Sequence, residues 1–304
     1  MGTAAIHTVL GPIPPETLGP TLMHEHIFCD FYRVTGNLDH LLNDEDLAVE
    51  ELARLTAAGG RGLVECTTLD LGRDEAGLRR IARRTGLQIV MGTGWYRQPY
   101  YPPEIDRATV EVLAERMIAD LRGESSGAVP AGILGEIGAD RDYLTAQEER
   151  VLRAAARAQR ATGAPITTHA SMYPVGVRQL ALLCEEGVDP ERVVVGHCDT
   201  YLDPTYHRRV LEAGAYVQFD TIGRRHINPD ERRADALTAL IREGWVERLL
   251  LSSDRCYRSD LHAFGGPGYD VVFDRFFTLL RARGIGEDEL TVMTVENPRR
   301  VLAW

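Results

Sequence analysis

Short runs of apolar and β-branched residues recur along the chain, and amphipathic segments separate them. This alternation is typical of β-strands that are each followed by an α-helix. Two of the runs, at 193–195 and 249–251, are apolar at every position, as expected for parallel strands that are covered on both faces. The eight predicted strands are residues 21–28, 62–68, 87–96, 131–138, 165–170, 193–199, 216–223 and 248–254.

Residues that start and stop helices lie between the predicted strands. Thr145 and Glu148 form a capping box ahead of a helix that runs to about residue 162, and Gly163 marks its end. A cap residue followed by a proline predicts the starts of two further helices, at Asp203-Pro204 and at Asn228-Pro229-Asp230. Helix signals therefore follow nearly every strand.

Eight such strand and helix units without a Gly/Ser linker favour an α/β fold, a (β/α)8 TIM barrel that forms a single domain over residues 1–304. A doubly wound open sheet is the alternative. It is disfavoured because no G-x-G-x-x-G motif follows the first predicted strand. Two connections are long for a barrel, at 29–43 and at 255–269, and the second, rich in Gly and Arg, could cover a site.

The chain is acidic, since 34 Lys and Arg residues against 45 Asp and Glu residues give a formal net charge of −11. Such a chain is poorly suited to neutralising phosphates, which argues against a nucleic-acid partner. No apolar run approaches the roughly 20 residues of a membrane helix, and the N-terminus lacks the features of a signal peptide. Five scattered cysteines without C-x-x-C spacing favour reduced thiols over a disulfide framework. We therefore expect a cytoplasmic protein.

Side chains that ligate metals gather at the C-terminal ends of the predicted strands, where a barrel carries its active site. His24 and His26 end the first strand, and their spacing of two places both imidazoles on one strand face. That pair alone is a weak signal, but four other strands end in a histidine or a carboxylate. The six predicted ligands are His24, His26, Glu136, His169, His197 and Asp254.

Six ligands exceed what a single tetrahedral zinc accepts, and they suit two divalent ions that share a carboxylate. The sequence therefore predicts a binuclear centre. In the predicted layout, His24, His26 and Asp254 hold the more buried ion, His169 and His197 hold the more exposed ion, and Glu136 bridges the two.

Motifs around these residues cover nearly the whole chain: Leu18-Gly19-Pro20-Thr21-Leu22-Met23-His24-Glu25-His26, Gly135-Glu136-Ile137-Gly138, Val195-Gly196-His197-Cys198-Asp199, Gln218-Phe219-Asp220-Thr221-Ile222-Gly223 and Glu296-Asn297-Pro298. Together they resemble the phosphotriesterase family of the amidohydrolase superfamily, and within it the phosphotriesterase homology proteins. The resemblance implies a hydrolase with two metal ions, usually zinc, held by the six residues above. It also suggests a homodimer.

The bridging position departs from the phosphotriesterases proper, in which a carbamylated lysine joins the two ions. All 34 basic residues of this chain are arginine, so no lysine can take that role, and Glu136 stands at the corresponding position. The phosphotriesterase homology proteins are similar in using a glutamate there. The departure therefore selects this branch of the family and argues against efficient organophosphate hydrolysis.

Two cations that share a water lower its pKa, so we expect a metal-bridging hydroxide as the nucleophile. Asp254 is expected to act as the catalytic residue that takes the proton from this water and passes it to the leaving group. The predicted reaction is hydrolysis of a carboxylic ester, lactone or amide in a small, anionic molecule. The alternatives are a phosphoester or phosphotriester hydrolase and, in another class, a noncatalytic metal-binding or ligand-binding barrel.

Arginines stand just past several predicted strand ends, and guanidinium groups match the geometry of carboxylates and phosphates. This pattern predicts an anionic substrate group, although each arginine is equally well explained as a solvated side chain at the rim. Tyr96 could orient a carbonyl or leaving oxygen, and Trp95, Tyr100 and Tyr101 could form an apolar wall. The predicted substrate-binding residues are Tyr96, Arg73, Arg224, Arg255 and Arg258, while Arg97, Arg225 and His226 occupy similar positions.

Overall fold

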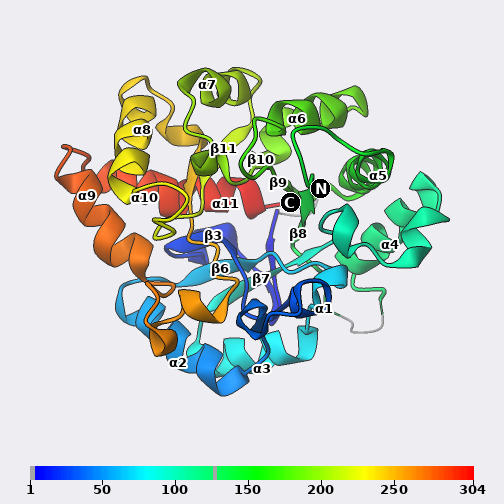
Figure 1. Cartoon of the computed structure of the whole chain (residues 1–304), viewed down its shortest axis with the longest axis horizontal. Helices are drawn as coiled ribbons and strands as arrows, with labels where there is room; N and C mark the ends of the chain where they lie inside the picture. The colour runs from blue at the N-terminus through cyan, green and yellow to red at the C-terminus, as the bar shows by residue number, and fades with distance from the viewer. Residues whose placement is uncertain (1–3, 126–128) are drawn as a thin grey trace.

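Eight parallel strands form a single sheet that curves almost into a closed barrel, with helices around it (Figure 1). The sheet order β12-β11-β10-β9-β8-β7-β6-β3 places each strand beside the one that follows it along the chain. The strands are β3 (Thr21–Glu25), β6 (Gly62–Glu65), β7 (Gln88–Thr93), β8 (Ile133–Gly138), β9 (Ile166–His169), β10 (Val193–Val195), β11 (Tyr216–Phe219) and β12 (Leu249–Leu251). The predicted (β/α)8 barrel is confirmed, and every predicted strand is present in a shorter form.

The computed structural model describes residues 4–125 and 129–304. The single domain predicted over 1–304 therefore includes six residues, 1–3 and 126–128, that lie outside the described residues. Within the described ranges, no helix has the length and apolar character that would let it cross a membrane.

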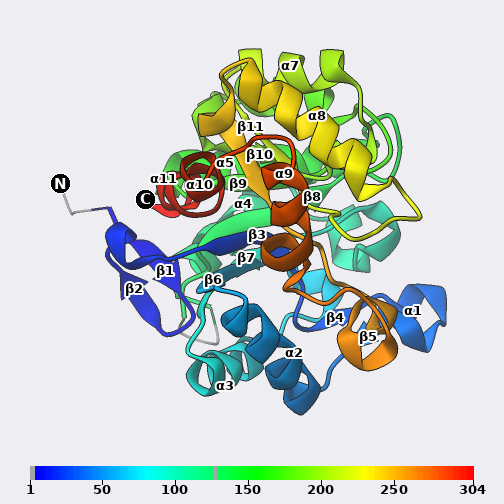
Figure 2. The same ribbon diagram turned by 90° about the vertical axis from the view of Figure 1, so that its left-hand side faces the viewer.

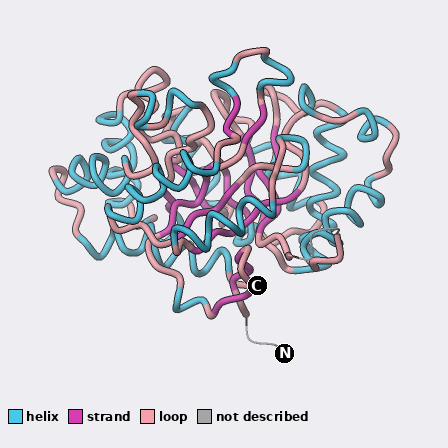
Figure 3. Tube along the Cα trace, turned by 90° about the horizontal axis from the view of Figure 1, so that it is seen from below, coloured by secondary structure: helices cyan, strands magenta, loops and turns pink. Residues whose placement is uncertain are grey.

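Each barrel strand is followed by a helix, so the helices surround the sheet (Figures 1 and 3). They are α2 (Glu45–Ala57), α3 (Glu75–Thr85), α4 (Val110–Leu121), α5 (Ala146–Thr162), α6 (Gly176–Glu185), α7 (Pro204–Glu212), α8 (Asp230–Arg242) and α9 (Phe277–Arg281), with α10 (Glu287–Thr291) and α11 (Asn297–Leu302) at the C-terminus. The capping box of Thr145 and Glu148 opens α5, and Gly163 ends it with a φ of 87°. Both features were predicted from the sequence.

The starts of α7 and α8 show why one of the two predicted caps does not form. The Asp203 carboxylate accepts a hydrogen bond from the backbone N–H of Thr205 and so caps α7. At α8 the N-cap is Pro229, and Asn228 is turned away. Its amide donates to the backbone oxygen of Asp199 at 2.9 Å instead, which ties α8 to the loop after β10.

Side chains alternate between two apolar clusters along each strand, as the pleat of a β-strand requires. In β12, Leu249 and Leu251 belong to the large cluster that the strands share with the helices. Leu250, between them, belongs to a smaller cluster that also contains Ile6 and Leu302 from the terminal segments. The smaller cluster therefore fills the inside of the barrel and is closed off where the two ends of the chain meet.

The two ends of the barrel differ in what covers them (Figure 2). The hairpin of β1 (Ile6–Thr8) and β2 (Gly11–Ile13) lies with the C-terminus at one end. At the other end lies the predicted long connection 29–43, which folds into β4 (Cys29–Asp30), α1 (Tyr32–Thr35) and β5 (Leu41–Leu42). It packs against the second long connection, where Ser259 Oγ donates to Asp39 at 2.7 Å and Arg258 Nε donates to the Leu41 oxygen at 3.0 Å.

Arg233 of α8 is fully buried and joins this helix to the loops after β10 and β11. Its guanidinium contacts Asp199 Oδ2 at 2.6 Å, Asp230 Oδ1 at 3.0 Å and Thr221 Oγ1 at 2.7 Å. Removing one partner of a buried ion pair leaves the other charge buried and unpaired. We expect Arg233→Met to lower the free energy of unfolding by about 3–5 kcal/mol.

This prediction is checked by urea unfolding, with Arg232→Met as the matched control. Arg232 is the preceding residue of the same helix, but it is exposed. The control should change the free energy of unfolding by less than about 0.5 kcal/mol. Equal stabilities of the two variants would show that the buried network does not stabilise the fold.

Candidate metal centre

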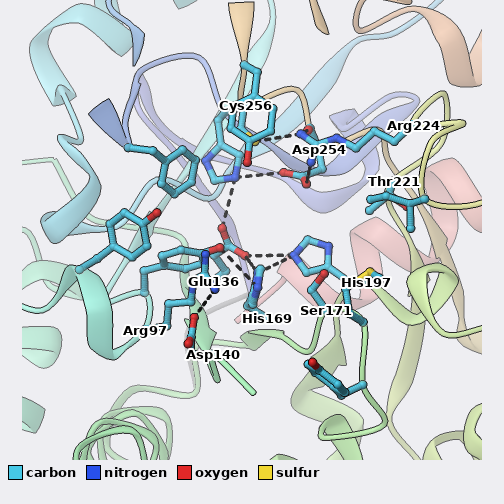
Figure 4. Close-up of a pocket in the computed structure, with 18 of the residues that line it drawn as sticks. Arg97, Glu136, Asp140, His169, Ser171, His197, Thr221, Arg224, Asp254 and Cys256 are labelled. Atoms are coloured by element: carbon cyan, nitrogen blue, oxygen red, sulfur yellow. Dashed lines mark hydrogen bonds and ion pairs between the residues drawn. The ribbon is translucent and has the colours of Figure 1, made fainter. Parts of the chain in front are cut away.

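Four imidazoles surround the carboxylate of Glu136 at the C-terminal ends of the barrel strands, and Figure 4 labels two of them, His169 and His197. Nε2 of His24 and Nε2 of His197 lie 3.4 and 3.3 Å from Glu136 Oε2. Nδ1 of His169 lies 2.8 Å from the same oxygen. Nε2 of His26 lies 3.3 Å from the other oxygen, Oε1. One buried carboxylate thus contacts four histidines that lie in or just after three strands, β3, β9 and β10.

Asp254 completes the cluster on the side of the first strand. Its Oδ1 lies 3.3 Å from His26 Nε2 and 3.9 Å from His24 Nε2. The structure therefore brings together all six side chains that the sequence predicted as ligands. Three groups in the described chain have possible ligand atoms within 4.8 Å of one another: His24 with His26 and Asp254, Glu136 with His169 and His197, and His24 with His197 and Asp220.

The buried ring of His24 provides a test of whether these residues fit metal ions. His24 is fully buried, and neither ring nitrogen has a hydrogen-bond partner. Asp220 Oδ2 lies 3.4 Å from its Nδ1, so Nε2 is the nitrogen that is turned toward Glu136. A buried polar atom without a partner costs about 1–3 kcal/mol. A cation bound to the neutral imidazole would remove this cost, so the residues fit divalent metal ions.

The ionisation states of both carboxylates and of His169 agree with this fit. Burial raises the pKa of Glu136, but His24, His169 and His197 together outweigh burial and hold the pKa well below its usual range. Burial also opposes ionisation of Asp254, and the Arg224 guanidinium keeps the pKa of this carboxyl below its usual value. Burial lowers the pKa of His169 to about 3, which leaves this imidazole neutral. Ionised carboxylates and neutral imidazoles are the forms that bind metal ions. Against the effect of burial, the neighbouring acidic groups raise the pKa of His26 and of His197 well above the usual value, so these two imidazoles would release a proton when they bind a cation.

Two of the six predicted ligands have a backbone conformation that non-glycine residues rarely adopt. His197 has a φ of 56° and Asp254 has a φ of 51°. Met172 has a φ of 65°, and among the described residues these three are the non-glycine residues with positive φ. All three line the same pocket. Such strained residues gather at functional sites, where the surrounding structure holds them in place.

Asp220 is a site residue to which the sequence analysis gave no role, although it lies within one of the quoted motifs. It follows β11, and its Oδ1 accepts hydrogen bonds from Nδ1 of His197 at 2.8 Å and from the His197 backbone N–H at 3.0 Å. Its Oδ2 faces Nδ1 of His24 at 3.4 Å. A carboxylate behind a ligating histidine fixes the orientation of the ring. The position of Asp220 at a strand end, level with the predicted ligands, is the signal that could have identified it.

Glu25, the residue between the first two histidines, also had no predicted role, and it holds the loop that carries Asp254. Its Oε1 accepts hydrogen bonds from Ser252 Oγ, from the Ser253 backbone N–H and from Ser253 Oγ, each at 2.7 Å. Its Oε2 accepts from the backbone N–H of Arg255 at 2.9 Å. Glu25 therefore fixes the backbone on both sides of Asp254 and joins β3 to the end of β12.

A pocket of about 350 Å³ opens onto the cluster (Figure 4). Five of the six predicted ligands line it, while His24 lies behind them. Tyr96 lines the pocket as predicted, with its hydroxyl 3.4 Å from Nε2 of His169. Of the three predicted wall residues, Tyr100 lines the pocket, and Trp95 and Tyr101 do not. The remaining aromatic lining comes from Phe31, Tyr173 and Tyr257.

Among the predicted substrate-binding arginines, Arg224 lines the pocket. The structure does not bring Arg73, Arg255 or Arg258 to it, because each has partners elsewhere. Arg73 forms a two-pronged ion pair with Asp120 of α4. The guanidinium of Arg255 is fully buried and donates to backbone oxygens, and Arg258 joins the two long connections. Arg97 and His226 also line the pocket, and Arg225 does not.

Comparisons with known proteins agree with this geometry. The model of the Phosphotriesterase family matches residues 4–302. The phosphotriesterase homology protein of Escherichia coli (strain K12) is 38% identical over 284 residues, which cover 93% of this chain and 97% of the relative. A crystal structure of the phosphotriesterase homology protein from Escherichia coli, complexed with phosphate in its active site, has a TM-score of 0.92 at 37% identity and covers 95% of this chain and 100% of its own.

Two further relatives are named for hydrolytic reactions. An N-acetyltaurine hydrolase of Tetraodon nigroviridis is 30% identical over 344 residues, with 98% of both chains covered. A crystal structure of a lactonase from Listeria monocytogenes has a TM-score of 0.91 at 28% identity and covers 98% of both chains. Since the family model spans almost the whole sequence and the relatives share both sequence and fold, this chain belongs to the phosphotriesterase family.

Proposed function

We propose that this protein is a hydrolase with two divalent metal ions, expected to be zinc, that cleaves a carboxylic ester, lactone or amide bond in a small, anionic molecule. The proposed ligands of one ion are His24, His26 and Asp254, those of the other are His169 and His197, and Glu136 is the proposed bridge. The observation that carries the proposal is the buried Glu136 carboxylate with four histidine nitrogens within 3.4 Å of its oxygens. The names of the lactonase and of the N-acetyltaurine hydrolase support lactone and amide bonds as targets.

When bound, such a metal pair polarises the scissile carbonyl and lowers the pKa of a shared water to near neutrality. The protein's part is proton transfer and orientation. Asp254 is held by Arg224, whose Nη1 lies 3.1 Å from Oδ2, and its Oδ1 faces the cluster. This carboxylate accepts the proton of the attacking water and returns it to the leaving group. The Tyr96 hydroxyl, beside His169, donates a hydrogen bond to the substrate oxygen.

The metal content tests this proposal most directly. Protein purified without chelators is expected to hold about two divalent ions per chain, as measured by mass spectrometry of the metals. Dialysis against a chelator should abolish hydrolysis, and added zinc, manganese or cobalt should restore it. A substrate panel of lactones, esters, N-acyl amino acids and phosphorylated sugar lactones identifies the bond. Activity that survives complete metal removal would refute the proposal.

Phosphoester or phosphotriester hydrolysis is the second candidate. It is favoured by one observation, the phosphate in the active site of the Escherichia coli relative. The same residues could serve a phosphoryl group, because a metal pair also stabilises displacement at phosphorus. Comparing kcat/KM for an aryl phosphotriester and for the lactone panel separates the two candidates. Faster cleavage of the phosphotriester would reverse their order.

We also propose that residues 1–304 work as one catalytic domain in the cytoplasm. The proposed ligands come from strands β3 to β12, so nearly the whole length of the chain contributes to one centre. All five cysteines are free thiols, and four of them are buried, which suits a reducing compartment.

A further inference from the structure

Two arginines of the described chain line the pocket, and their hydrogen-bond partners distinguish them. Arg224 is committed to the protein itself. Its Nη1 pairs with Asp254 at 3.1 Å, and its Nη2 contacts the sulfur of Cys256 at 2.9 Å and Asp260 Oδ2 at 3.0 Å. The side chain is 8% exposed. Arg224 therefore positions Asp254 and has little capacity left for a ligand.

Arg97 has unused hydrogen-bonding capacity. Its Nη1 forms an ion pair with Asp140, which among the described residues is its one hydrogen bond to another side chain. A guanidinium carries five N–H donors, so one carboxylate leaves most of them available. The side chains of Arg97 and Asp140 are 26% and 24% exposed, which leaves this ion pair open to the pocket. Part of the guanidinium is therefore accessible from the pocket.

The surroundings of Arg97 fix the plane of its guanidinium. Its Cζ lies 4.9 Å from the ring centre of Tyr96 and 5.3 Å from that of Tyr100. The Tyr96 and Tyr100 rings in turn pack against Phe31, at 5.7 and 5.3 Å between ring centres. Stacking on aromatic faces leaves the edge of a guanidinium free for planar recognition of an oxyanion. Arg97 is thus a cation in a fixed orientation beside an aromatic wall.

Arg97 also lies close to the metal cluster. Gly138 separates it from His169, and a side chain there would meet Arg97 Cβ at 3.3 Å and His169 Cβ at 3.2 Å. Glycine at 138 therefore allows the two side chains to lie next to each other. In Figure 4, Arg97 and Asp140 lie on the side of the pocket near His169, opposite Asp254 and Arg224.

We propose that Arg97 is the anchor for an anionic group of the substrate, a carboxylate, sulfonate or phosphate, and that Tyr96 and Tyr100 pack against the carbon chain between this group and the scissile bond. The proposal rests on the proposed hydrolase function and names the residue that would bind the anionic group of its substrate. It also assigns the anion to Arg97, one of the arginines past the predicted strand ends, rather than to the four arginines predicted as substrate-binding residues.

Metal-loaded protein and a pair of esters that differ in one charge test the proposal. The pair is 4-nitrophenyl acetate, which is neutral, and mono-4-nitrophenyl succinate, which carries a carboxylate. The wild type should prefer the succinate ester in kcat/KM. Because a hydrogen-bonded charge is lost, Arg97→Met should reduce this preference about 10- to 100-fold, mainly through the KM of the succinate ester. Arg97→Lys should restore part of it.

Arg141→Met is the matched control, since Arg141 Nε also lies near Asp140, at 3.6 Å, but the residue does not line the pocket. This variant should keep the wild-type preference. An unchanged preference in Arg97→Met would overturn the assignment. Binding of inorganic phosphate, measured by calorimetry, decides the case if neither ester is cleaved. If phosphate binds Arg97→Met at least tenfold more weakly than it binds the wild type, the assignment of Arg97 is supported, and equal binding overturns it. Failure of the whole substrate panel counts instead against the proposed hydrolase function.

Discussion

Asp254→Asn should lower kcat about 10³-fold while the metal content stays near that of the wild type. Asparagine keeps an oxygen that can ligate a cation, but it cannot accept the proton of the attacking water. Asp254 is suited to that step because Arg224 holds one carboxylate oxygen and Glu25 fixes the backbone on both sides. The measurements are steady-state kinetics on the preferred substrate and metals per chain.

The control for this variant is Asp274→Asn, which removes the same charge at an exposed position. It should retain the activity of the wild type. Activity of Asp254→Asn within about twofold of the wild type would remove Asp254 from proton transfer. Parallel loss of metal and activity would instead show that Asp254 acts mainly as a ligand.

Glu136→Gln should lower the metal content from about two ions to one or fewer per chain, and activity by more than about 100-fold. The reason is that Glu136 supplies the central negative charge to four imidazoles, whose nitrogens lie 2.8 to 3.4 Å from its oxygens. Glutamine preserves the size of the side chain but not the charge. Its amide N–H groups would also face histidine nitrogens that are meant for cations.

Metal analysis after extensive dialysis, together with kinetics at saturating zinc, measures this effect. The control is Glu115→Gln, an exposed glutamate on α4. It should bind metal and act like the wild type. Two tightly held ions in Glu136→Gln would show that this carboxylate does not bridge the pair.

The strands were predictable because their signal is local. Each barrel strand lies in a run of mostly apolar residues, because a strand that is buried on both faces does not alternate apolar with polar positions. The ends of the strands were predicted too far along the chain. His26 and Asp254, for example, were assigned to strands that stop at Glu25 and Leu251. Hydrophobicity does not reveal where the ladder of backbone hydrogen bonds stops. Three of the six predicted ligands, His26, His197 and Asp254, lie beyond the observed strand ends.

The cap of α8 and the roles of Asp220 and Glu25 required the structure for a different reason. Asn228 has a better partner in the Asp199 carbonyl than in its own helix, and this partner lies 29 residues away. Glu25 bonds to Ser253, 228 residues along the chain. Polar side chains choose partners that are near in space, and the sequence does not give those distances.

The sequence by itself determined the alternation of strands and helices. In a barrel of parallel strands all C-terminal ends lie on the same side, so the histidines and carboxylates at those ends were expected at one rim. Only the tertiary structure decided which cations remain free for a ligand. Arg73 is paired with Asp120, 47 residues away, whereas the ion pair of Arg97 with Asp140 is partly exposed and lines the pocket. An arginine side chain is long and flexible, so its role depends on which acceptors the fold brings within its reach.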